Sequence, residues 1–508
     1  MEYYDPRDYD LAGRIAKLKT NHGIIETPYL FPVVDPARQE VPLNILLEIG
    51  FNAFITNAYL YYKRKRGVPT NIHEFFKWNN PIMTDSGGYQ ILVYGSVDID
   101  NKTIVTYEKE IGTDIAVILD IPTGTQMSWD KAYSAVKETH RRAIEALPLI
   151  MDSNQLWVYP VQGAPYPELV KYASTIGSKL PYHIYALGSP TVYLERYSYE
   201  NILELATIAR MRLPPNKPFH VFGVGHPMII PFLVAIGADL FDSASYILYA
   251  RDERLIFEWG TRRLDELAYL PCNCPVCSRY SVKELYELPK SERIRLIAIH
   301  NLYALAEELK RTKEAIREGR LWEYLYQKSK LHPSLRKAYN VLSKYIDYLA
   351  KFNPETKTPT QALLLIDKEL AINPRLSSIR SKTLKLLKSK IRGRIILVPA
   401  IEKPFTQQEL YNNIKRKYRD HDFLFYNPYL GVFPPELSNT YPYFQHEIGV
   451  YEFNEKIFEE VVNRIDELIQ QISEVIVVTT EKPGFKEFSE RLILYFKNKN
   501  VKTTIIRA

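Results

Sequence analysis

The first 245 residues alternate short apolar runs with longer amphipathic stretches, which is the pattern of strands alternating with helices. Apolar residues recur at helical spacing in the intervening segments 42–49, 128–149, 167–176 and 199–211. The predicted strands are the eight apolar runs at 29–34, 51–56, 82–84, 115–119, 156–161, 182–186, 220–223 and 240–241.

Eight strands joined by helical crossovers predict an α/β fold of the TIM (β/α)8 type, for which about 250 residues is the usual size. A doubly wound open sheet is the alternative. The sequence Val33-Val34-Asp35-Pro36 follows the first strand where such a sheet usually carries a glycine-rich phosphate turn, so the barrel is favoured.

The remaining chain predicts a smaller second domain. Residues 255–349 are expected to be mostly helical, and 352–359 have the composition of a linker. Beyond them, apolar runs at 395–400, 423–426, 475–479 and 503–506 alternate with helical patterns at 407–416, 455–472 and 486–497. We therefore expect a larger barrel domain at 1–350 and a smaller C-terminal α/β domain at 351–508.

Every cysteine of the chain falls within six residues, at Cys272, Cys274 and Cys277. Such close spacing disfavours disulfides, whereas three thiolates and one histidine suit zinc. His300, in the helical run that follows, is the best-placed fourth ligand. Four protein ligands leave no open position, so we expect one structural Zn²⁺ per chain rather than a catalytic one.

Polar residues follow the predicted strands, at the rim where TIM barrels carry their chemistry. Asp85, Asp120 and Asp242 come directly after strands three, four and eight, and glycine-containing turns follow strands five, six and seven. A carboxylate pair beside a sugar carbon suits retaining glycosyl transfer. Tyr89 could stack on a base, and Asp120 could accept two N–H bonds from a guanine edge.

The composition changes this picture little. Hydrophobic residues make up 46% and charged residues 25%, as in globular proteins, and the net charge of +7 permits a nucleic-acid partner without requiring one. No apolar run reaches the length of a membrane span, and the start MEYYDPRDYD lacks the features of a signal peptide. We therefore expect a cytoplasmic protein with no membrane partner.

The motifs together resemble the tRNA-guanine transglycosylase family, in order and in spacing. They are Asp85-Ser86-Gly87-Gly88-Tyr89-Gln90, Val161-Gln162-Gly163, Leu187-Gly188-Ser189, Gly223-Val224-Gly225, Phe241-Asp242-Ser243 and Cys-x-Cys-x2-Cys with a downstream histidine. The resemblance covers about residues 10 to 330, and the further 150 or so residues resemble the archaeal branch.

This resemblance implies exchange of guanine 15 in the tRNA D-arm for 7-cyano-7-deazaguanine (preQ0), a step of archaeosine biosynthesis. It implies Asp242 as nucleophile and Asp85 as general acid/base. The substrate-binding positions that it implies are Ser86, Tyr89, Asp120, Gln162, Gly188 and Gly223. Archaeal relatives usually end in a PUA domain, for which this chain has no room, so a separate PUA-domain protein is an expected partner. A homodimer stays open.

Residues 371–400 contain eight basic and no acidic residues, which predicts a phosphate-binding stripe. The basic members are Arg375, Arg380, Lys382, Lys385, Lys388, Lys390, Arg392 and Arg394, of which we assign tRNA contacts to Lys385, Lys388, Arg392 and Arg394. An ordinary solvated surface is the alternative. Lys63-Arg64-Lys65-Arg66 is a second candidate, or an exposed loop tip.

Three other functions remain open at this point. An archaeosine synthase-like paralogue would have lost the transglycosylase residues, and a non-catalytic tRNA-binding subunit would not need them. Retention of Asp85, Asp242 and the cysteine cluster argues against both. A hydrolytic nucleosidase would differ only in using water to resolve the covalent intermediate.

Overall fold

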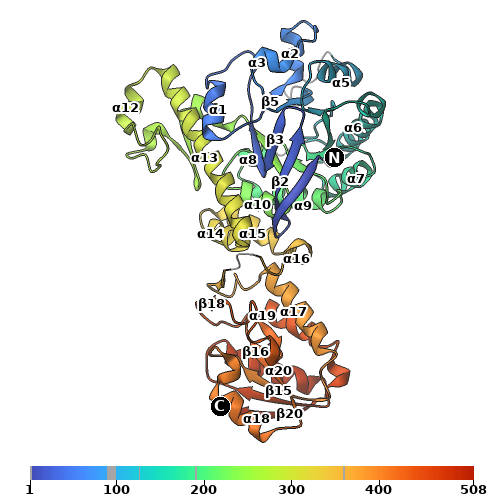
Figure 1. Ribbon diagram of the computed structural model, residues 1–508, viewed down its shortest axis with the longest axis vertical. Coiled ribbons are helices and arrows are strands. Elements are labelled where there is room, and N and C mark those ends of the chain that lie inside the picture. Colours follow the sequence, from blue (N-terminus) through green and yellow to red (C-terminus); the bar gives the residue numbers. More distant parts are fainter. Residues whose placement is uncertain (1–2, 89–98, 125, 189–190, 358–360) are drawn as a thin grey trace. The chain divides into compact units, whose positions relative to one another are not determined.

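The computed structural model describes residues 3–88, 99–124, 126–188, 191–357 and 361–508. The chain divides into two compact units, Met1–Lys344 and Tyr345–Ala508 (Figure 1). The division falls a few residues before the boundary expected at 350. None of the helices in the described ranges is long and apolar enough to cross a membrane.

The first unit is built on an eight-stranded parallel sheet in the order β4-β11-β10-β9-β8-β7-β6-β5. Its strands are β4 (Tyr29–Pro32), β5 (Phe54–Asn57), β6 (Ile82–Asp85), β7 (Ile115–Val117), β8 (Leu156–Val161), β9 (Ile184–Leu187), β10 (Phe219–Val221) and β11 (Leu240–Ser243). A parallel bridge between Val33 and Ile55, with Val34 N donating to Ile55 O at 2.8 Å, joins the two end strands. The sheet is therefore a TIM barrel, and the open-sheet alternative was wrong.

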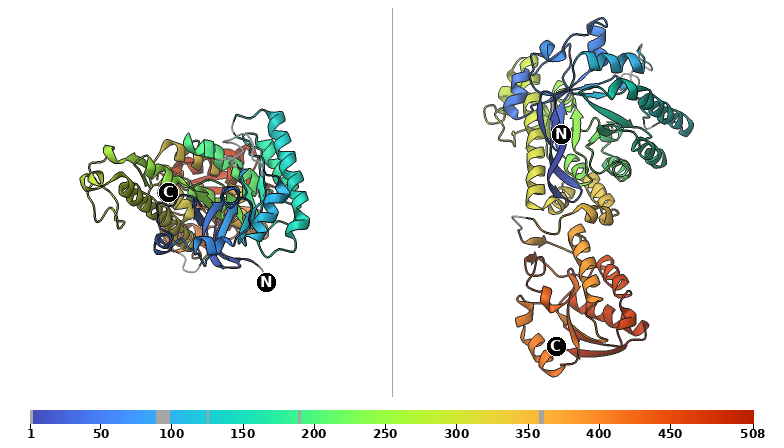
Figure 2. Two further views of the ribbon diagram at one scale, coloured as in Figure 1. Left: turned by 90° about the horizontal axis from the view of Figure 1, so that it is seen from above. Right: turned by 45° about the vertical axis from the view of Figure 1, so that its right-hand side comes forward.

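Helices follow each strand and lie around the outside of the strands (Figure 2). α6 buries an alanine-rich stripe, including Ala132, Ala135, Ala143 and Ala146, which lets it pack closely. The barrel helices in the described residues are α1 (Leu43–Ile49), α2 (Ala58–Arg64), α3 (Ile72–Phe76), α5 (Asn101–Glu110), α6 (Trp129–Ile150), α7 (Pro167–Gly177), α8 (Thr191–Glu195), α9 (Tyr199–Arg210), α10 (Ile230–Ala235) and α11 (Ser245–Arg251).

A three-stranded antiparallel sheet precedes the barrel and was not predicted from the sequence: β1 (Tyr4–Asp10), β2 (Gly13–Thr20) and β3 (Gly23–Thr27). It contacts the amino ends of the barrel strands. Tyr4 Oη donates to Asp239 Oδ1 at 2.6 Å, and Arg14 forms a buried ion pair with the same carboxylate. Asp239 directly precedes β11, so this sheet covers the face of the barrel opposite the strand ends expected to carry the chemistry.

The segment after the barrel begins with a hairpin, β12 (Arg254–Phe257) and β13 (Gly260–Arg263), where the sequence predicted mostly helix. Asn301 holds this hairpin to the long helix, because its side chain accepts from Ile256 N and donates to the carbonyls of Arg254 and Tyr246. The rest of the segment is helical: η1 (Leu264–Glu266), α12 (Val282–Glu287), α13 (Lys290–Glu318), α14 (Leu321–Ser329) and α15 (Pro333–Leu342).

The second unit contains a five-stranded sheet in the order β17-β16-β15-β19-β20, parallel except for β17. Its helices are α16 (Ile346–Phe352), α17 (Pro374–Leu387), α18 (Glu409–Lys417), α19 (Glu455–Ile465) and α20 (Phe485–Asn498), with short turns η2 (Phe405–Gln407), η3 (Pro435–Leu437) and η4 (Ile469–Gln471). Its strands are β14 (Leu363–Leu365), β15 (Arg394–Pro399), β16 (Asp422–Asn427), β17 (Gly431–Phe433), β18 (His446–Ile448), β19 (Glu474–Thr479) and β20 (Lys502–Arg507); β14 and β18 pair separately.

Candidate active site

The carboxyl ends of the barrel strands enclose a cavity of about 570 Å³. Parallel strands bring their carboxyl ends to one rim, so residues far apart in sequence meet there. Six of the residues assigned to catalysis or base recognition line it: Asp85, Asp120, Gln162, Gly188, Gly223 and Asp242. The outer part of the cavity is lined by further polar and aromatic residues, among them Glu40, Tyr249 and Arg251.

Asp85 ends β6 and is poised to exchange a proton near neutral pH. Burial, and then the nearby charge of Asp120, raise the pKa of Asp85 to about 7. Gly87 N and Asn57 Nδ2 donate to its two oxygens at 3.3 and 3.0 Å and oppose this rise. Asn57 was missed in the sequence, although it follows strand two as Asp85 follows strand three. Applying the strand-end criterion to every strand would have found it.

Asp120 and Gln162 form a hydrogen-bonded pair in the cavity wall. Gln162 Nε2 donates to Asp120 Oδ2, and Gln162 Oε1 accepts from Thr123 N at 3.2 Å. Burial raises the pKa of Asp120 to about 6, and the hydrogen bond from Gln162 limits the rise. The pair therefore presents a carboxylate and an amide side by side, a combination that can read the donor and acceptor edge of a base.

Two glycines at the rim make room for these polar side chains. A β-carbon on Gly88 would lie 2.1 Å from Asp120 Oδ1, and one on Gly188 would lie 2.1 Å from Gln162 Nε2. The space that the two glycines leave is filled by the side chains of Asp120 and Gln162.

Asp242 lies within β11 and is held through one of its oxygens. Its Oδ1 lies 2.8 Å from His220 Nε2 and accepts from Gly223 N at 3.0 Å. The side chain is 14% exposed, and it lines the cavity. His220 was missed in the sequence, because an inward-facing residue in the middle of a strand carries no strand-end signal.

Two predicted substrate residues differ from the others. Ser86 is fully buried, does not line the cavity, and donates through Oγ to Ile118 O at 3.0 Å. Its hydroxyl is thus used to fix the turn after β6. Tyr89, the predicted stacking residue, lies outside the described residues.

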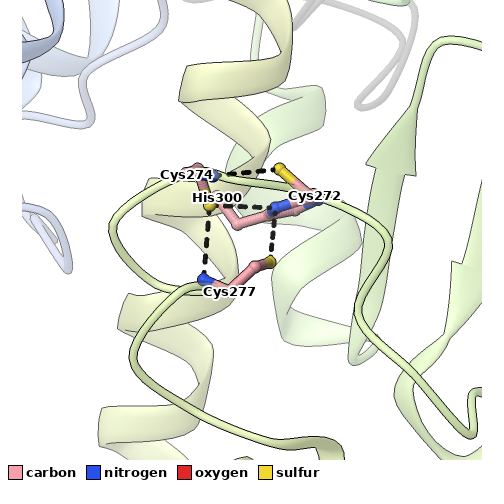
Figure 3. A group of neighbouring side chains, drawn as sticks. All are labelled: Cys272, Cys274, Cys277 and His300. Carbon is pink, nitrogen blue, oxygen red and sulfur yellow. Dashed lines mark hydrogen bonds between the residues drawn. The ribbon is translucent and has the colours of Figure 1, made fainter.

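Cys272, Cys274, Cys277 and His300 form one cluster between the loop after η1 and helix α13 (Figure 3). Their ligand atoms all lie within 4.8 Å of one another. Cys274 Sγ and Cys277 Sγ lie 3.4 and 3.3 Å from His300 Nδ1. These separations are close to the edges of a tetrahedron around Zn²⁺, given Zn–S and Zn–N bonds of about 2.3 and 2.0 Å.

The surroundings of His300 also fit a metal ligand. Its Nε2 lies 3.0 Å from Ile256 O, so Nε2 carries the hydrogen and the lone pair of Nδ1 points toward the thiols. The side chain is fully buried. The four residues can therefore hold a metal ion, which would tie the loop at 272–277 to α13.

The basic stripe is only partly a surface. Arg380 is buried and binds both Glu460 and the Tyr429 carbonyl, and the buried Arg375 donates to Tyr441 Oη. Those two arginines stabilise the second unit, which corrects their expected place in a phosphate-binding surface. The four residues assigned to tRNA contacts are all exposed: Lys385, Lys388, Arg392 and Arg394.

A closed parallel barrel with carboxylates gathered at the carboxyl ends of its strands is the architecture of a TIM-barrel enzyme. The family model for queuine tRNA-ribosyltransferase matches residues 9–334, and the chain belongs to this family. It is therefore a pentosyltransferase by family, and the match contains all eight strands of the barrel.

Similar curated proteins are named tRNA-guanine(15) transglycosylase. The protein from Aeropyrum pernix is 44% identical over 450 residues, covering 87% of each chain. The one from Saccharolobus solfataricus is 40% identical over 499 residues, covering 95% of this chain and 98% of the relative. The one from Thermococcus kodakarensis is 39% identical over 417 residues, covering 80% of this chain and 71% of the relative.

Proposed function

We propose that this chain exchanges guanine 15 of tRNA for preQ0, as a cytoplasmic step of archaeosine formation. The relatives carry the name of a transglycosylase acting at that guanine. The observation that supports the chemistry best is the pairing, in one cavity, of a carboxylate held through a single oxygen with a carboxyl whose pKa is about 7.

In the first step, Oδ2 of Asp242 attacks C1′ of the ribose and the C1′–N9 bond breaks. The bonding electrons leave with guanine, and protonated Asp85 supplies the proton that the leaving base needs. Because Oδ1 is occupied by His220 and Gly223, the other oxygen is the one left for attack. The product is a ribosyl ester on Asp242.

In the second step, preQ0 replaces guanine in the same position. Its N9 proton passes to the carboxylate that Asp85 has become, N9 attacks C1′, and the C1′–Oδ2 bond breaks to regenerate Asp242. Two inversions restore the β configuration. No proton is gained or lost over the cycle, which a single group with a pKa near neutrality can support.

Asp120 and Gln162 would hold the base during both steps. The carboxylate accepts N–H donors from a guanine-like edge and the amide provides a donor and an acceptor. Hydrogen bonds to a charged group are worth about 1.5 to 3 kcal/mol each, enough to discriminate between bases. Guanine and preQ0 share this edge, so one pocket can serve the leaving and the entering base.

The four metal-ligating residues, Cys272, Cys274, Cys277 and His300, would hold one structural Zn²⁺. The bound ion supplies folding free energy and cross-links the loop to α13. Four protein ligands close the coordination shell, and the chemistry above runs through carboxylates alone.

The tRNA backbone would contact the exposed basic residues before and at the start of β15. In the described part of the chain, Lys385 and Arg392 form no ion pair, while Lys388 and Arg394 lie 4.0 and 3.8 Å from Glu467 and Glu474. Exposed pairs at such distances are weak and can be exchanged for phosphate. Lys63–Arg66 on the barrel unit is a second candidate, and a separate PUA-domain protein or a second copy of the chain could add further contacts.

The decisive experiment uses tRNA carrying labelled guanine, incubated with the full-length protein with and without preQ0. We expect release of label only with an added base, and substitution mapped to position 15. Release without added base would instead indicate a hydrolytic nucleosidase. Binding without release would indicate a tRNA-binding subunit, and no reaction until the tRNA already carries preQ0 would indicate a synthase-like paralogue.

A further inference from the structure

His220 is fully buried on β10, and among the described residues its side-chain hydrogen bond to the active site goes to Asp242. Its Nε2 lies 2.8 Å from Asp242 Oδ1, so Nε2 carries the hydrogen of this bond. Its Nδ1 is buried and has no hydrogen-bond partner in the described part of the chain. The ring does not line the cavity, so His220 does not touch substrate.

Aromatic packing fixes the imidazole in this orientation. Phe31 stacks on the ring with centroids 6.1 Å apart, and Phe222 packs against it at 4.6 Å. Phe31 lies in β4, His220 lies in β10, and Phe222 directly follows β10; β4 and β10 are the two neighbours of β11 in the sheet. A buried polar ring with one nitrogen unpaired costs free energy. Packing alone would be served as well by phenylalanine, which points to a role for the hydrogen bond.

We propose that His220 is a positioning residue for the nucleophile: it fixes the rotamer of Asp242 and stabilises the carboxylate when it is released. This inference rests on the proposed function, in which Asp242 attacks C1′. Together with Gly223 N, His220 occupies Oδ1 and leaves Oδ2 as the reacting oxygen. The side chain is thereby held by two donors on one oxygen, as a preorganised nucleophile requires.

The hydrogen bond should affect the two chemical steps differently. In the first step, Asp242 loses its negative charge as the C1′–Oδ2 bond forms and the C1′–N9 bond breaks. In the second, the C1′–Oδ2 bond breaks and its electrons return to the carboxylate, so a donor on Oδ1 assists departure. Without His220, the attack is slowed because Asp242 is less well oriented. Release of the ester is slowed for the same reason and also because the departing carboxylate loses a hydrogen-bond donor.

The test compares His220→Phe, which keeps an aromatic ring, with His220→Gln, whose amide can still donate to Asp242. We expect His220→Phe to lower kcat about 10- to 100-fold with KM for tRNA within about twofold, the size of one hydrogen bond to a charged group. The covalent tRNA adduct should form a larger fraction of the enzyme than in the wild type. His220→Gln should recover kcat to within about threefold.

His446→Phe is the matched control, because His446 is an equally buried imidazole that stacks on Phe405 and hydrogen-bonds Pro442 O in the second unit. It should leave kcat unchanged. If His220→Phe does not fold, His220→Asn replaces it, since the shorter amide cannot reach Oδ1. If His220→Gln has the same kcat as His220→Phe, or as His220→Asn where that variant is used instead, the inference is overturned. Exchange by Asp242→Asn would instead overturn the proposed nucleophile, whatever His220 does.

Discussion

Gly188 and Gln162 interlock: a β-carbon on Gly188 would lie 2.1 Å from Nε2 of Gln162. That amide nitrogen is the one that donates to Asp120. The two residues directly follow the neighbouring strands β9 and β8, so the missing side chain of Gly188 leaves the space that the side chain of Gln162 occupies.

We expect Gly188→Ala to displace Gln162 and to break its hydrogen bond with Asp120. Affinity for the base should fall, so KM for preQ0 should rise by about 10-fold or more, the cost of one disrupted hydrogen bond to a charged group. Folding should change little, because Gln162 can move into the cavity. Steady-state kinetics with varied preQ0 measure this. Gly177→Ala, which would press on Tyr159 instead, separates effects on the fold from effects on the pocket.

The rate should depend on pH through Asp85. Burial and the charge of Asp120 raise the pKa of Asp85 to about 7, and the first step needs the protonated form. Therefore kcat/KM for tRNA should fall about tenfold per pH unit above that pKa. In Asn57→Ala the hydrogen bond that lowers the pKa of Asp85 is removed, so the alkaline limb should move to higher pH. If the alkaline limb of the pH profile does not move in Asn57→Ala, Asp85 is not the acid of the first step.

Removing a ligand of the Cys3His cluster should cost both metal and stability. Cys274→Ser should reduce zinc content from about one per chain to near zero, since structural zinc contributes folding free energy directly. Metal analysis and thermal unfolding with and without a chelator measure the two effects. Ser278→Ala, which removes only a hydroxyl that donates to Cys274 O, should keep the metal. A stable, metal-free wild-type protein would contradict the assignment.

The stacked pair of His22 and His73 should give the barrel unit a pH-dependent stability. His73 and His22 stack at 3.6 Å, and both contact Asp114. Burial alone would lower the pKa of His73, but hydrogen bonds with Asp114 and Trp78 O outweigh it, and the pKa is raised. This contribution is present below the unfolded pKa of about 6.5 and is lost as pH rises through the higher folded pKa.

The difference in unfolding free energy between wild type and His73→Gln should therefore be larger at pH 5.5 than at pH 8.5. His140→Gln is a control with the opposite sign. Burial lowers the pKa of His140, so the stability of the wild type relative to this variant should increase as pH rises. Denaturant titrations at the two pH values measure both slopes. Equal slopes for the two variants would contradict the assignment.

Charge reversal in the second unit should weaken tRNA binding. Lys385→Glu with Arg392→Glu should lower affinity and reduce the slope of log K against log salt by roughly 0.7 to 0.9 for each phosphate that is no longer neutralised. Lys456→Glu is the control: α19 begins at the opposite, carboxyl edge of the sheet. An equal decrease in affinity for the double variant and for Lys456→Glu would indicate a general charge effect. Unchanged affinity in the double variant would show that Lys385 and Arg392 belong to an ordinary solvated surface.

The barrel strands could be predicted because each is a short run of residues buried on both faces. All eight predicted runs coincide with strands to within a few residues. The N-terminal sheet could not, since only the end residues Tyr4 and Asp10 of β1 are buried, and the positions between them, polar ones such as Asp5 and Arg7 included, are partly or fully exposed. The hairpin at 254–263 was not predicted either, because charged residues such as Arg262 and Arg263 are also typical of the exposed face of a helix.

Cavity-lining residues that directly follow an apolar run of the sequence could be predicted, whereas His220, which belongs to such a run, could not. Asp85, Asp120 and Asp242 are visible because a carboxylate after an apolar run is unusual. His220 is visible only once β10 and β11 are seen side by side. Similarly, Arg380 cannot be told from Lys385 by sequence, because both belong to one basic helix and only packing against Glu460 distinguishes them.

The hydrogen bond from Tyr4 to Asp239 spans 235 residues, and this separation affects how the chain folds during synthesis. At a synthesis rate of about 5 to 20 residues per second, the first strand leaves the ribosome roughly 12 to 47 seconds before its partner exists. During that time β1 to β3 have no barrel to cover. β1 is thus synthesised well before its contacts with the barrel can form, and chaperones have that interval in which to bind it.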